Sequence, residues 1–484
     1  MILLLIDGIE INELNSGGLQ YNLENVKQIE VLYGPASVLY GTNAISGIIN
    51  IITYSPDDYK TEKSTIGIAT GTFNTTIADA RTGYIDEQKE LGYTFSARYA
   101  TSEKADLAGI DGDNNRYDTM ENFEKTYTLE GKFDYKDFSV GMLYQDKKAS
   151  RTTTNNKSIG TIYQDYGTLW HISFLNLWLR HEQKINQDIN LNSLLYYRDS
   201  TVHDDTIAYI NTIDGQVAYY CPNSLFGIEE QLNYKISEKT NLTFALQYEQ
   251  ENLSENFSRS LSGDINIEPI NPLSPIMLKQ DLYSVYLQLQ QKVMEKTEVT
   301  LGGRYDYMSN SKENIFTPRI SIMHHYNDKF SIYSSYAEAY RAPKPWDFTY
   351  GDGNSELQSE TMQSYELGFN YMLNSSIHTS VVLYHNTIKN KFTKENNRWE
   401  NSEQLITKGL ELTLDYKINK HSVFANYSYN DSKNKDGSIH HGVAKNIANA
   451  GFLYSFTNNL KLSTQFNYIG KYTGFKTVTA TGTK

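Results

Sequence analysis

The sequence predicts an all-β fold in which antiparallel strands close into a transmembrane barrel, and three observations carry this prediction. From about residue 64 onward, segments of roughly ten residues alternate apolar with polar side chains, and the charged residues keep to the polar face. Short turns alternate with long polar connections along the same part of the chain. Tyrosine occurs 39 times and proline only 9 times, which suits the aromatic girdles of membrane barrels and the low proline content of sheets.

Composition excludes several other classes of protein. The mean hydropathy is −0.54, and no apolar run approaches the roughly 18 residues that a membrane-spanning helix needs. A net charge of −13 provides no basic patch to neutralise phosphates, so a nucleic-acid partner is not expected. The single cysteine, Cys221, excludes an internal disulfide framework.

The first 56 residues have a different pattern from the rest of the chain. Residues 28–32 alternate and predict a short strand, which the Gly34–Pro35 pair ends. Residues 36–40 predict a tight turn or one helical turn. The run GIINIIT at residues 47–53 is β-branched with apolar residues on both sides, which predicts a strand buried on both faces. Six residues separate Gly34 from Gly41 and no Lys-Ser/Thr pair follows, so this segment is not a phosphate-binding loop.

Charged side chains fall on one face of each predicted barrel strand. In the segment 93–100, Thr94, Ser96 and Arg98 point one way, and the other face carries Tyr93, Phe95, Ala97 and Tyr99. The same division recurs at residues 129–135, 299–307, 410–416 and 460–468. Because an arginine or lysine that faces lipid near mid-membrane costs roughly 2–4 kcal/mol, the charged face is expected to line the lumen. A soluble β-sandwich also alternates, so the loop lengths are needed to decide between the two folds.

Loop lengths favour the membrane barrel. Short turns are predicted near residues 86–90, 136–137, 185–187, 237–239, 295–296, 327–328, 374–375 and 419–420. Long polar connections are predicted at residues 102–122, 147–167, 201–221, 251–279, 339–360, 388–405 and 431–444. This strict alternation is typical of outer-membrane barrels, which have short periplasmic turns and long extracellular loops, and it would be unusual in a soluble domain. Counting the segments gives about 19 strands before Tyr472.

Two groups of motifs resemble those of TonB-dependent outer-membrane receptors. Two segments resemble the plug domain of that family: LIDGIEIN at residues 5–12 and NVKQIEVLYGPASVLYGTNAISGIINIIT at residues 25–53. The barrel of the family is resembled by YRAPKPWDF at 340–348, GNSELQSETMQSYELGFNY at 353–371, and the shorter pieces LGGRYDY, TPRISI and KGLELTLDY. Together these motifs span nearly the whole chain. At Tyr33 the sequence departs from the family, which often has an arginine there that can meet lumenal carboxylates.

The resemblance implies a small mixed α/β plug inside the barrel lumen. Residues 1–56 are expected to be part of this plug, and residues 57–484 to be the barrel, which has about 22 strands in plugged transporters and lacks its last strands here. The signal peptide and the TonB box are also expected to be missing from this chain, so TonB would bind an absent N-terminal segment. The plug residues expected to have a structural or gating role are Asp7, Gly8, Glu30, Gly34, Pro35, Ser37, Tyr40, Gly41, Gly47 and Asn50.

The implied function is TonB-dependent active transport across the outer membrane of a Gram-negative cell, by a monomer in contact with lipid. A ferric siderophore or another iron complex is the expected substrate. Lumenal contacts between plug and barrel, or structural ion pairs, are expected for Arg304, Arg319, Glu366 and Glu411. Substrate contacts, with cations suited to an anionic ferric complex, are expected for Tyr340, Arg341, Trp346 and Tyr350, together with Lys344.

Two alternatives stay open. The chain could take up cobalamin, or it could be a surface receptor or adhesin barrel that transports nothing. Haem is less favoured. Haem receptors of this family typically carry a histidine between two sequence motifs, and the corresponding segment here, from Ala342 to Asn354, contains no histidine.

No pattern in the sequence predicts an enzyme or a bound metal or cofactor. No GxSxG or HExxH motif occurs. The pair His324–His325 lies on a predicted strand, where adjacent side chains point to opposite faces, and the pair His440–His441 lies in a long loop. One acidic loop could hold Ca²⁺ through carboxylate oxygens, although a solvated loop is the simpler interpretation. Its carboxylates are Asp106, Asp111, Asp113 and Asp118.

Overall fold

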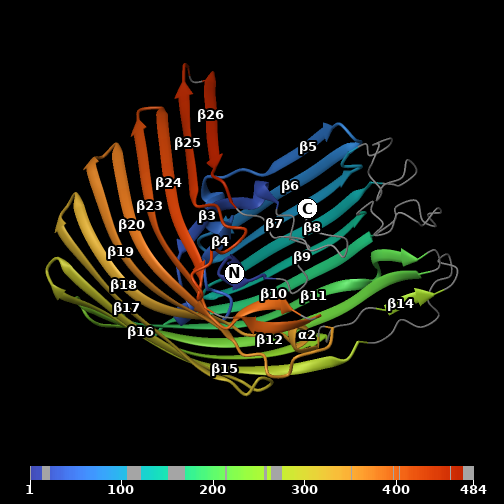
Figure 1. Ribbon diagram of the computed structural model, residues 1–484. Coiled ribbons are helices and arrows are strands. Elements are labelled where there is room, and N and C mark those ends of the chain that lie inside the picture. Colours follow the sequence, from blue (N-terminus) through green and yellow to red (C-terminus); the bar gives the residue numbers. More distant parts are fainter. Residues whose placement is uncertain are drawn as a thin grey trace.

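The computed structural model describes residues 2–12, 22–105, 122–150, 169–212, 215–254, 259–262, 275–349, 351–395, 397–402, 404–457 and 459–472. Most of these residues belong to one large antiparallel sheet that wraps into a barrel (Figure 1). No helix in the described part of the chain is both long and apolar enough to cross a bilayer.

Nineteen long strands form the barrel wall in the described part of the chain, in agreement with the predicted number of about 19. They are β5 (Thr65–Gly71), β6 (Thr75–Asp86), β7 (Leu91–Ser102), β8 (Glu124–Tyr135), β9 (Phe138–Ser150), β10 (Leu169–Lys184), β11 (Ile189–Thr212), β12 (Gly215–Ser237), β13 (Thr240–Ser254), β15 (Met277–Met294), β16 (Thr297–Met308), β17 (Asn314–Asn327), β18 (Phe330–Arg341), β19 (Glu360–Asn374), β20 (Ile377–Lys389), β23 (Leu405–Ile418), β24 (His421–Asn434), β25 (Asn446–Ser455) and β26 (Lys461–Ile469). Each pairs antiparallel with the next long strand, which is the up-and-down arrangement of membrane barrels.

The strand order closes with β26 next to β5, and Figure 1 shows these two strands diverging toward the top of the view. We call this junction the seam. Paired residues join all the remaining pairs of neighbouring long strands. Within the described residues, none join β26 to β5. Apolar side chains at this seam stay largely exposed, among them Ile66 and Ile68 of β5 and Phe466 of β26. The seam is therefore the least enclosed part of the wall.

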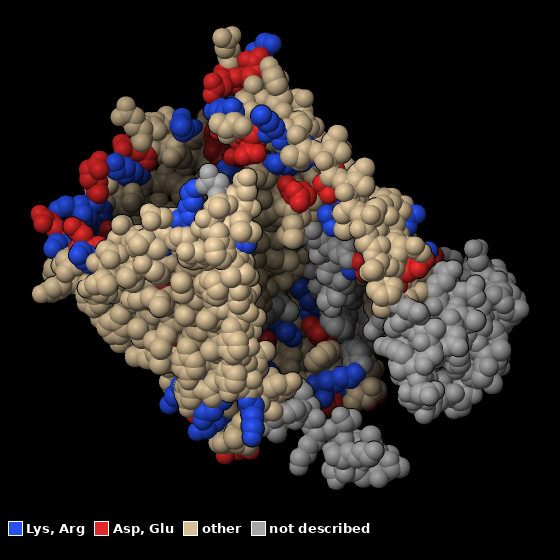
Figure 2. All heavy atoms as spheres, turned by 90° about the horizontal axis from the view of Figure 1, so that it is seen from above, with Lys and Arg blue, Asp and Glu red and all other residues tan. Residues whose placement is uncertain are grey.

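Outward side chains on the barrel strands are apolar and inward ones are polar, which confirms the predicted division. In β7, Tyr93 and Phe95 are 42% and 43% exposed, whereas Thr94 and Ser96 are 7% and 2% exposed. In β8, the carboxylate-bearing Glu130 is likewise buried. Figure 2 shows a wide face without charge, with the blue and red side chains gathered along its borders. A surface of this kind fits lipid, because charged side chains avoid the hydrocarbon.

The short connections agree with the sequence, and one long connection does not. All eight predicted short turns join consecutive strands. The predicted loop at 201–221 is wrong, because β11 and β12 continue through it as paired strands, with Val202 opposite Cys221. Polar residues such as Asp205 suggested a loop there, but both faces of a strand can carry polar groups once it leaves the membrane, while Val202 remains buried. Two further long connections contain short strands: β14 (Arg259–Ser262), and the hairpin of β21 (Lys391–Glu395) and β22 (Arg398–Ser402).

A small sheet near the N-terminus lies inside the curve of the barrel (Figure 1). Its strands are β1 (Leu3–Ile6), β2 (Ile9–Glu10), β3 (Val26–Tyr33) and β4 (Gly47–Thr53), in the order β2-β1-β4-β3. β4 runs parallel to β1 and antiparallel to β3. Between β3 and β4 the predicted helical turn occurs as α1 (Ser37–Tyr40), and the short 3-10 helix η2 (Pro56–Lys60) leads into the barrel. We call residues 2–12 and 22–53 the inner domain.

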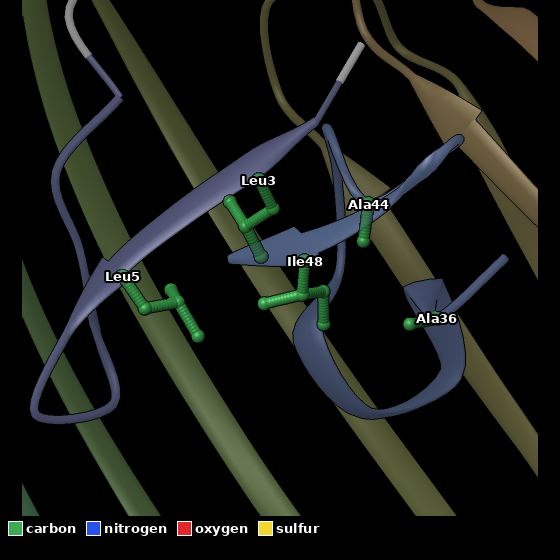
Figure 3. Packing of buried hydrophobic residues seen from close by; sticks show 5 residues of the cluster. All are labelled: Leu3, Leu5, Ala36, Ala44 and Ile48. Atoms are coloured by element: carbon green, nitrogen blue, oxygen red, sulfur yellow. The ribbon is translucent and has the colours of Figure 1, made fainter. Parts of the chain in front are cut away.

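A compact apolar cluster holds the inner domain together. Figure 3 shows Leu3 and Leu5 of β1 pointing toward Ile48 of β4, with Ala36 and Ala44 closing the cluster from the connection around α1. All five side chains are buried. The middle of β4 is only half-buried, so the predicted burial on both faces holds at the ends of this strand and not along its length.

Candidate functional site

The α1 turn of the inner domain docks onto the end of barrel strand β18 through hydrogen bonds. The backbone nitrogen of Tyr340 donates to the Ser37 hydroxyl at 3.2 Å. The Asn43 nitrogen donates to the Tyr340 carbonyl at 3.1 Å, and the Ala342 nitrogen donates to Thr42 Oγ1 at 3.1 Å. Ser37 begins α1, and Thr42 and Asn43 follow shortly after it, so polar groups at both ends of this single turn find partners on the barrel.

A buried polar network lies directly beneath this contact. Arg304 of β16 donates from Nε to both carboxylate oxygens of Asp306, at 2.8 and 3.0 Å. The Tyr340 hydroxyl donates to the same carboxylate at 2.8 Å. Arg304 Nη2 donates to Gln247 and Ser284, at 2.6 and 2.8 Å. Arg304, Asp306 and Tyr340 are 2%, 0% and 0% exposed, so the charges depend on one another for compensation.

Two glycines let the inner domain approach lumenal charges closely. Gly41 has a φ of +72°, and a Cβ built there would lie 3.0 Å from Arg304 Nη2. Gly34 has a φ of +81°, and a Cβ built there would lie 2.6 Å from Oε1 of Glu366. A side chain at either position would face both a strained backbone and a charged neighbour. These glycines therefore place the inner domain against the barrel wall.

A second attachment centres on Asp7, in the turn between β1 and β2. Its carboxylate lies 2.9 Å from Lys132 Nζ of β8, and its carbonyl accepts a 3.1 Å hydrogen bond from Arg180. The same carboxylate accepts hydrogen bonds from the nitrogen and hydroxyl of Thr53, at 2.9 and 2.8 Å. Asp7 thus links the end of β4 to the barrel wall.

A relay of polar groups runs from the inner domain toward the outer connections. Asn43 donates to Glu10 at 3.2 Å, and Glu10 lies 3.9 Å from Arg198 of β11. Arg198 in turn lies 3.8 Å from Glu251 of β13. Glu251 binds Lys344 Nζ through both oxygens, at 2.7 and 3.0 Å. Lys344, which the sequence suggests as a substrate cation, is therefore connected to the inner domain through two intervening side chains, Glu251 and Arg198.

The remaining motif residues of the inner domain make contacts within it. Asn50 accepts a 3.1 Å hydrogen bond from the Gly8 nitrogen and donates to Glu30 at 3.1 Å. Pro35 is buried, and Gly47 is buried at the start of β4. These residues hold the small sheet in shape.

An ion pair fastens β3 to η2 at the exit toward the barrel. Lys27 pairs with Asp58, and the Ser55 nitrogen also donates to this carboxylate, at 2.8 Å. Partial burial alone would raise the pKa of Asp58, but the hydrogen bonds from Lys27 and Ser55 outweigh it and hold that pKa below its usual range. The hydrogen bond and charge of Asp58 raise the pKa of Lys27.

A cavity of about 480 Å³ separates the inner domain from strands β10 to β13 and β15. Tyr40 of α1 and Glu10 of β2 line it on one side, and Arg180, Glu229 and Glu249 line it from the barrel. Its walls are mainly polar, so the cavity is suited to water or a polar solute.

The other lumenal residues singled out from the sequence make fewer polar contacts than Arg304. Glu366 contacts the backbone at Gly34, and Glu411 is half-buried on β23. Arg319 of β17 is half-buried and makes no ion pair within 4.0 Å with another described residue. Arg304 pairs with Asp306 instead of with either glutamate.

The predicted substrate residues have different surroundings. Tyr340 is fully buried, so its ring faces the protein interior. Arg341 is half-buried, with its Nε 3.6 Å from Glu360. Trp346 belongs to α2 (Pro345–Thr349), but its side chain lies outside the described part of the structure, as does Tyr350 entirely. Of these four residues, the structure describes the side chains of Tyr340 and Arg341 only, and the role of the group in substrate binding stays a prediction.

Other chemistry suggested by the sequence is dispersed. The acidic loop with Asp106, Asp111, Asp113 and Asp118 lies outside the described residues. His324 lies 2.9 Å from the hydroxyl of Thr297.

Sequence reasoning missed several residues that attach the inner domain. Glu130 accepts a 2.6 Å hydrogen bond from Asn25, and Ser96 lies 2.8 Å from Asn22. Both barrel residues lie on the polar face of a predicted strand, so the alternation pattern predicts that their side chains face the lumen. Their partners were not, because alternation says nothing about which groups meet across the lumen.

Comparison with known proteins reveals relatives of this chain. The profile of the family described as "TonB dependent receptor-like, beta-barrel" matches residues 16–483. The probable TonB-dependent siderophore receptor PirA of Acinetobacter baumannii is 23% identical over 572 residues, which cover 97% of this chain and 73% of PirA. The vitamin B12 transporter BtuB of Vibrio vulnificus is 24% identical over 429 residues, which cover 85% of this chain and 63% of BtuB.

Solved structures show the same architecture. A mutant ferric enterobactin receptor from Pseudomonas aeruginosa, in complex with enterobactin, superposes with a TM-score of 0.77 at 17% sequence identity. The superposition covers 98% of this chain and 79% of that receptor. At this level of identity the similarity shows a common fold.

Proposed function

The chain belongs to the family of TonB-dependent receptors, and on this premise we propose that it imports a ferric siderophore or a similar iron complex across the outer membrane of a Gram-negative cell. Residues 1–56 act as part of the plug, and the barrel from residue 57 onward provides the passage. The protein works as a monomer, with the apolar outer face of the barrel in lipid.

The observation that supports this proposal most is the polar attachment of the inner domain to the lumenal wall. The inner domain meets the wall through polar pairs that join Asp7 to Lys132, Glu10 to Arg198 and Ser37 to Tyr340. Two small apolar contacts accompany them, one around Ile6 and Ile11 and one around Ile45. Hydrogen bonds and ion pairs of this kind contribute about 0.5–3 kcal/mol each net, because water can replace either partner. Such an interface can be released step by step, which a plug must allow during transport.

Release of the plug needs energy from elsewhere. The outer membrane holds neither ATP nor a sustained potential, and each charge that crosses the inner membrane releases about 2.3 kcal/mol per 100 mV. In the proposed mechanism, TonB delivers this energy mechanically by pulling on a segment of the plug. The polar cavity beside the inner domain then widens into the passage.

The iron assignment rests on the relatives. PirA is named as a siderophore receptor, and the similar Pseudomonas structure holds enterobactin. Cobalamin is the second candidate, because BtuB matches 85% of this chain. We favour iron because siderophore receptors occur both among the sequence relatives and among the similar solved structures.

Uptake measurements test the proposal. Cells that lack their own receptors are given this protein, and the entry of radiolabelled ferric enterobactin, cobalamin and haem is followed with and without TonB. We expect TonB-dependent uptake of iron only. Iron uptake that persists without TonB contradicts the mechanism, and uptake of cobalamin alone contradicts the iron assignment. No uptake of any of the three would favour a receptor that does not transport.

A further inference from the structure

A cluster of two histidines and two aspartates lies on the outer wall of the barrel, away from the inner domain. Asp146 of β9 shares its face with Met142, which is 38% exposed. His171 of β10 shares its face with Leu177, which is 39% exposed, while Phe174 on the opposite face is buried. The cluster lies near the strand ends that lead to the long connections, beyond the apolar part of the wall.

Three of these side chains converge closely enough to share one ion. One ligand atom each from Asp146, His171 and His203 lies within 4.8 Å of the other two. Nε2 of His171 is 3.0 Å from Oδ2 of Asp146. The rings of His171 and His203 stack with their centroids 4.1 Å apart at 23°. A tight pair of imidazoles next to a carboxylate is a ligand set that zinc and related metals prefer.

Neighbouring groups orient both rings. Nδ1 of His171 lies 2.8 Å from Asp205, which is itself held by Lys148 at 2.8 Å. This leaves Nε2 of His171 directed at Asp146. The arrangement matches metal sites in which a carboxylate fixes the far nitrogen of a ligating histidine. Nε2 of His203 lies 2.9 Å from the Ser173 hydroxyl, so the second ring is also held.

Strand irregularities bring the residues together. The pairing of β10 with β11 shifts between Leu169 and Ile172, and that of β11 with β12 shifts between Val202 and Thr206. Bulges of this kind re-aim side chains and are frequent next to functional sites. They place His203 and Asp205 of one strand beside the single residue His171.

We propose that Asp146, His171 and His203 bind a divalent transition metal of the zinc class on the outer wall of the barrel, with Asp205 positioning His171. Two imidazole ligands disfavour Ca²⁺ and Mg²⁺, which take oxygen ligands. The metal joins β9, β10 and β11 where β11 begins its long extension past the membrane. It acts there as a structural clamp, independent of any transported substrate.

Metal titration of the purified protein in detergent tests this site. The protein is first stripped with a chelator, then titrated with Co²⁺ by visible absorption and with Zn²⁺ by calorimetry. We expect one equivalent to bind, with the d–d bands of a site with nitrogen ligands. His203→Ala and Asp146→Asn should abolish saturable binding, and Asp205→Asn should weaken it by about 10–100-fold.

His181→Ala is the matched control. His181 lies on the same strand, stacked on Phe138, and ten residues of strand separate it from His171 by about 33 Å. It should bind metal like the parent protein. A parent protein that binds no metal, or a His203→Ala variant that binds as well as His181→Ala, would overturn the proposal and leave the cluster as an ion-pair network. The heat-dependent gel mobility of folded barrels shows that each variant is folded, and Asp205→Asn still tests the site if a ligand variant fails to fold.

Discussion

The hydroxyl of Tyr340 donates a 2.8 Å hydrogen bond to the carboxylate of Asp306, and both residues are fully buried. The same tyrosine meets the inner domain through its backbone, at Ser37 and Asn43. One residue therefore connects the plug contact to the charge pair of Arg304 and Asp306.

Tyr340→Phe is expected to destabilise the docked plug. The substitution keeps the ring and the backbone contacts but removes one donor from a buried carboxylate, which costs about 1–3 kcal/mol. The measurement is the free energy of unfolding in urea, for protein reconstituted in vesicles. Tyr326→Phe is the control, because Tyr326 is 68% exposed and should tolerate the change. Equal unfolding energies for Tyr340→Phe and the parent protein would show that the hydrogen bond contributes nothing.

Much of the barrel could be predicted because a strand has a period of two. That period placed Arg304 and Asp306 on the lumenal face and left Leu301 and Tyr305 outside, as the structure has them. The turn positions followed from the same alternation, because it stops where a strand ends.

The contacts across the lumen could not be predicted in the same way. Arg304 pairs with Asp306, its neighbour on the same strand face, and not with Glu366 or Glu411 on distant strands. Which groups meet depends on how the inner domain is rotated within the barrel, and alternation carries no such information. The histidine cluster on the outer wall could not be predicted either, because the polarity of the segment around His203 predicted a loop there and not a strand.

The ion pair between Asp7 and Lys132 is expected to stabilise the attachment of the inner domain. The two side chains are 12% and 15% exposed, so solvent screens them less than a surface pair. A double-mutant cycle with Asp7→Asn and Lys132→Met should give a coupling energy of about 1–3 kcal/mol in urea unfolding. The matched cycle on Lys235 and Glu238, whose side chains are 43% and 88% exposed, should give a much smaller coupling energy, because solvent screens this pair. Coupling energies that do not differ would contradict the role of Asp7 as an anchor.

Acid is expected to weaken the join between β3 and η2. The pKa of Asp58 is held below its ordinary value of 3.8 by Lys27 and Ser55, against the effect of burial. A depressed pKa in the folded state gives stability that is present above the unfolded value and is lost as the pH falls through the folded value. Resistance of the segment after Thr53 to acid-active proteases should therefore drop below about pH 4. Asp58→Asn should be sensitive to the same proteases already at about pH 5 and should lose this dependence. A parent protein with a flat profile would contradict the assignment.

Gly41→Ala is expected to loosen the plug and make the barrel leak. The φ of +72° costs a residue with a side chain about 1–2 kcal/mol, and the added methyl group would press on Arg304 Nη2. A change of this size shifts the ratio of docked to undocked plug by a factor of about 5–30. The measurement is the sensitivity of cells to a glycopeptide antibiotic that intact outer membranes exclude. Gly437→Ala is the matched control, since Gly437 has a φ of +82° and nothing within 4 Å of a built Cβ. The same backbone strain is then present without the charged neighbour, so equal leakage from both variants would mean that contact with Arg304 does not hold the plug.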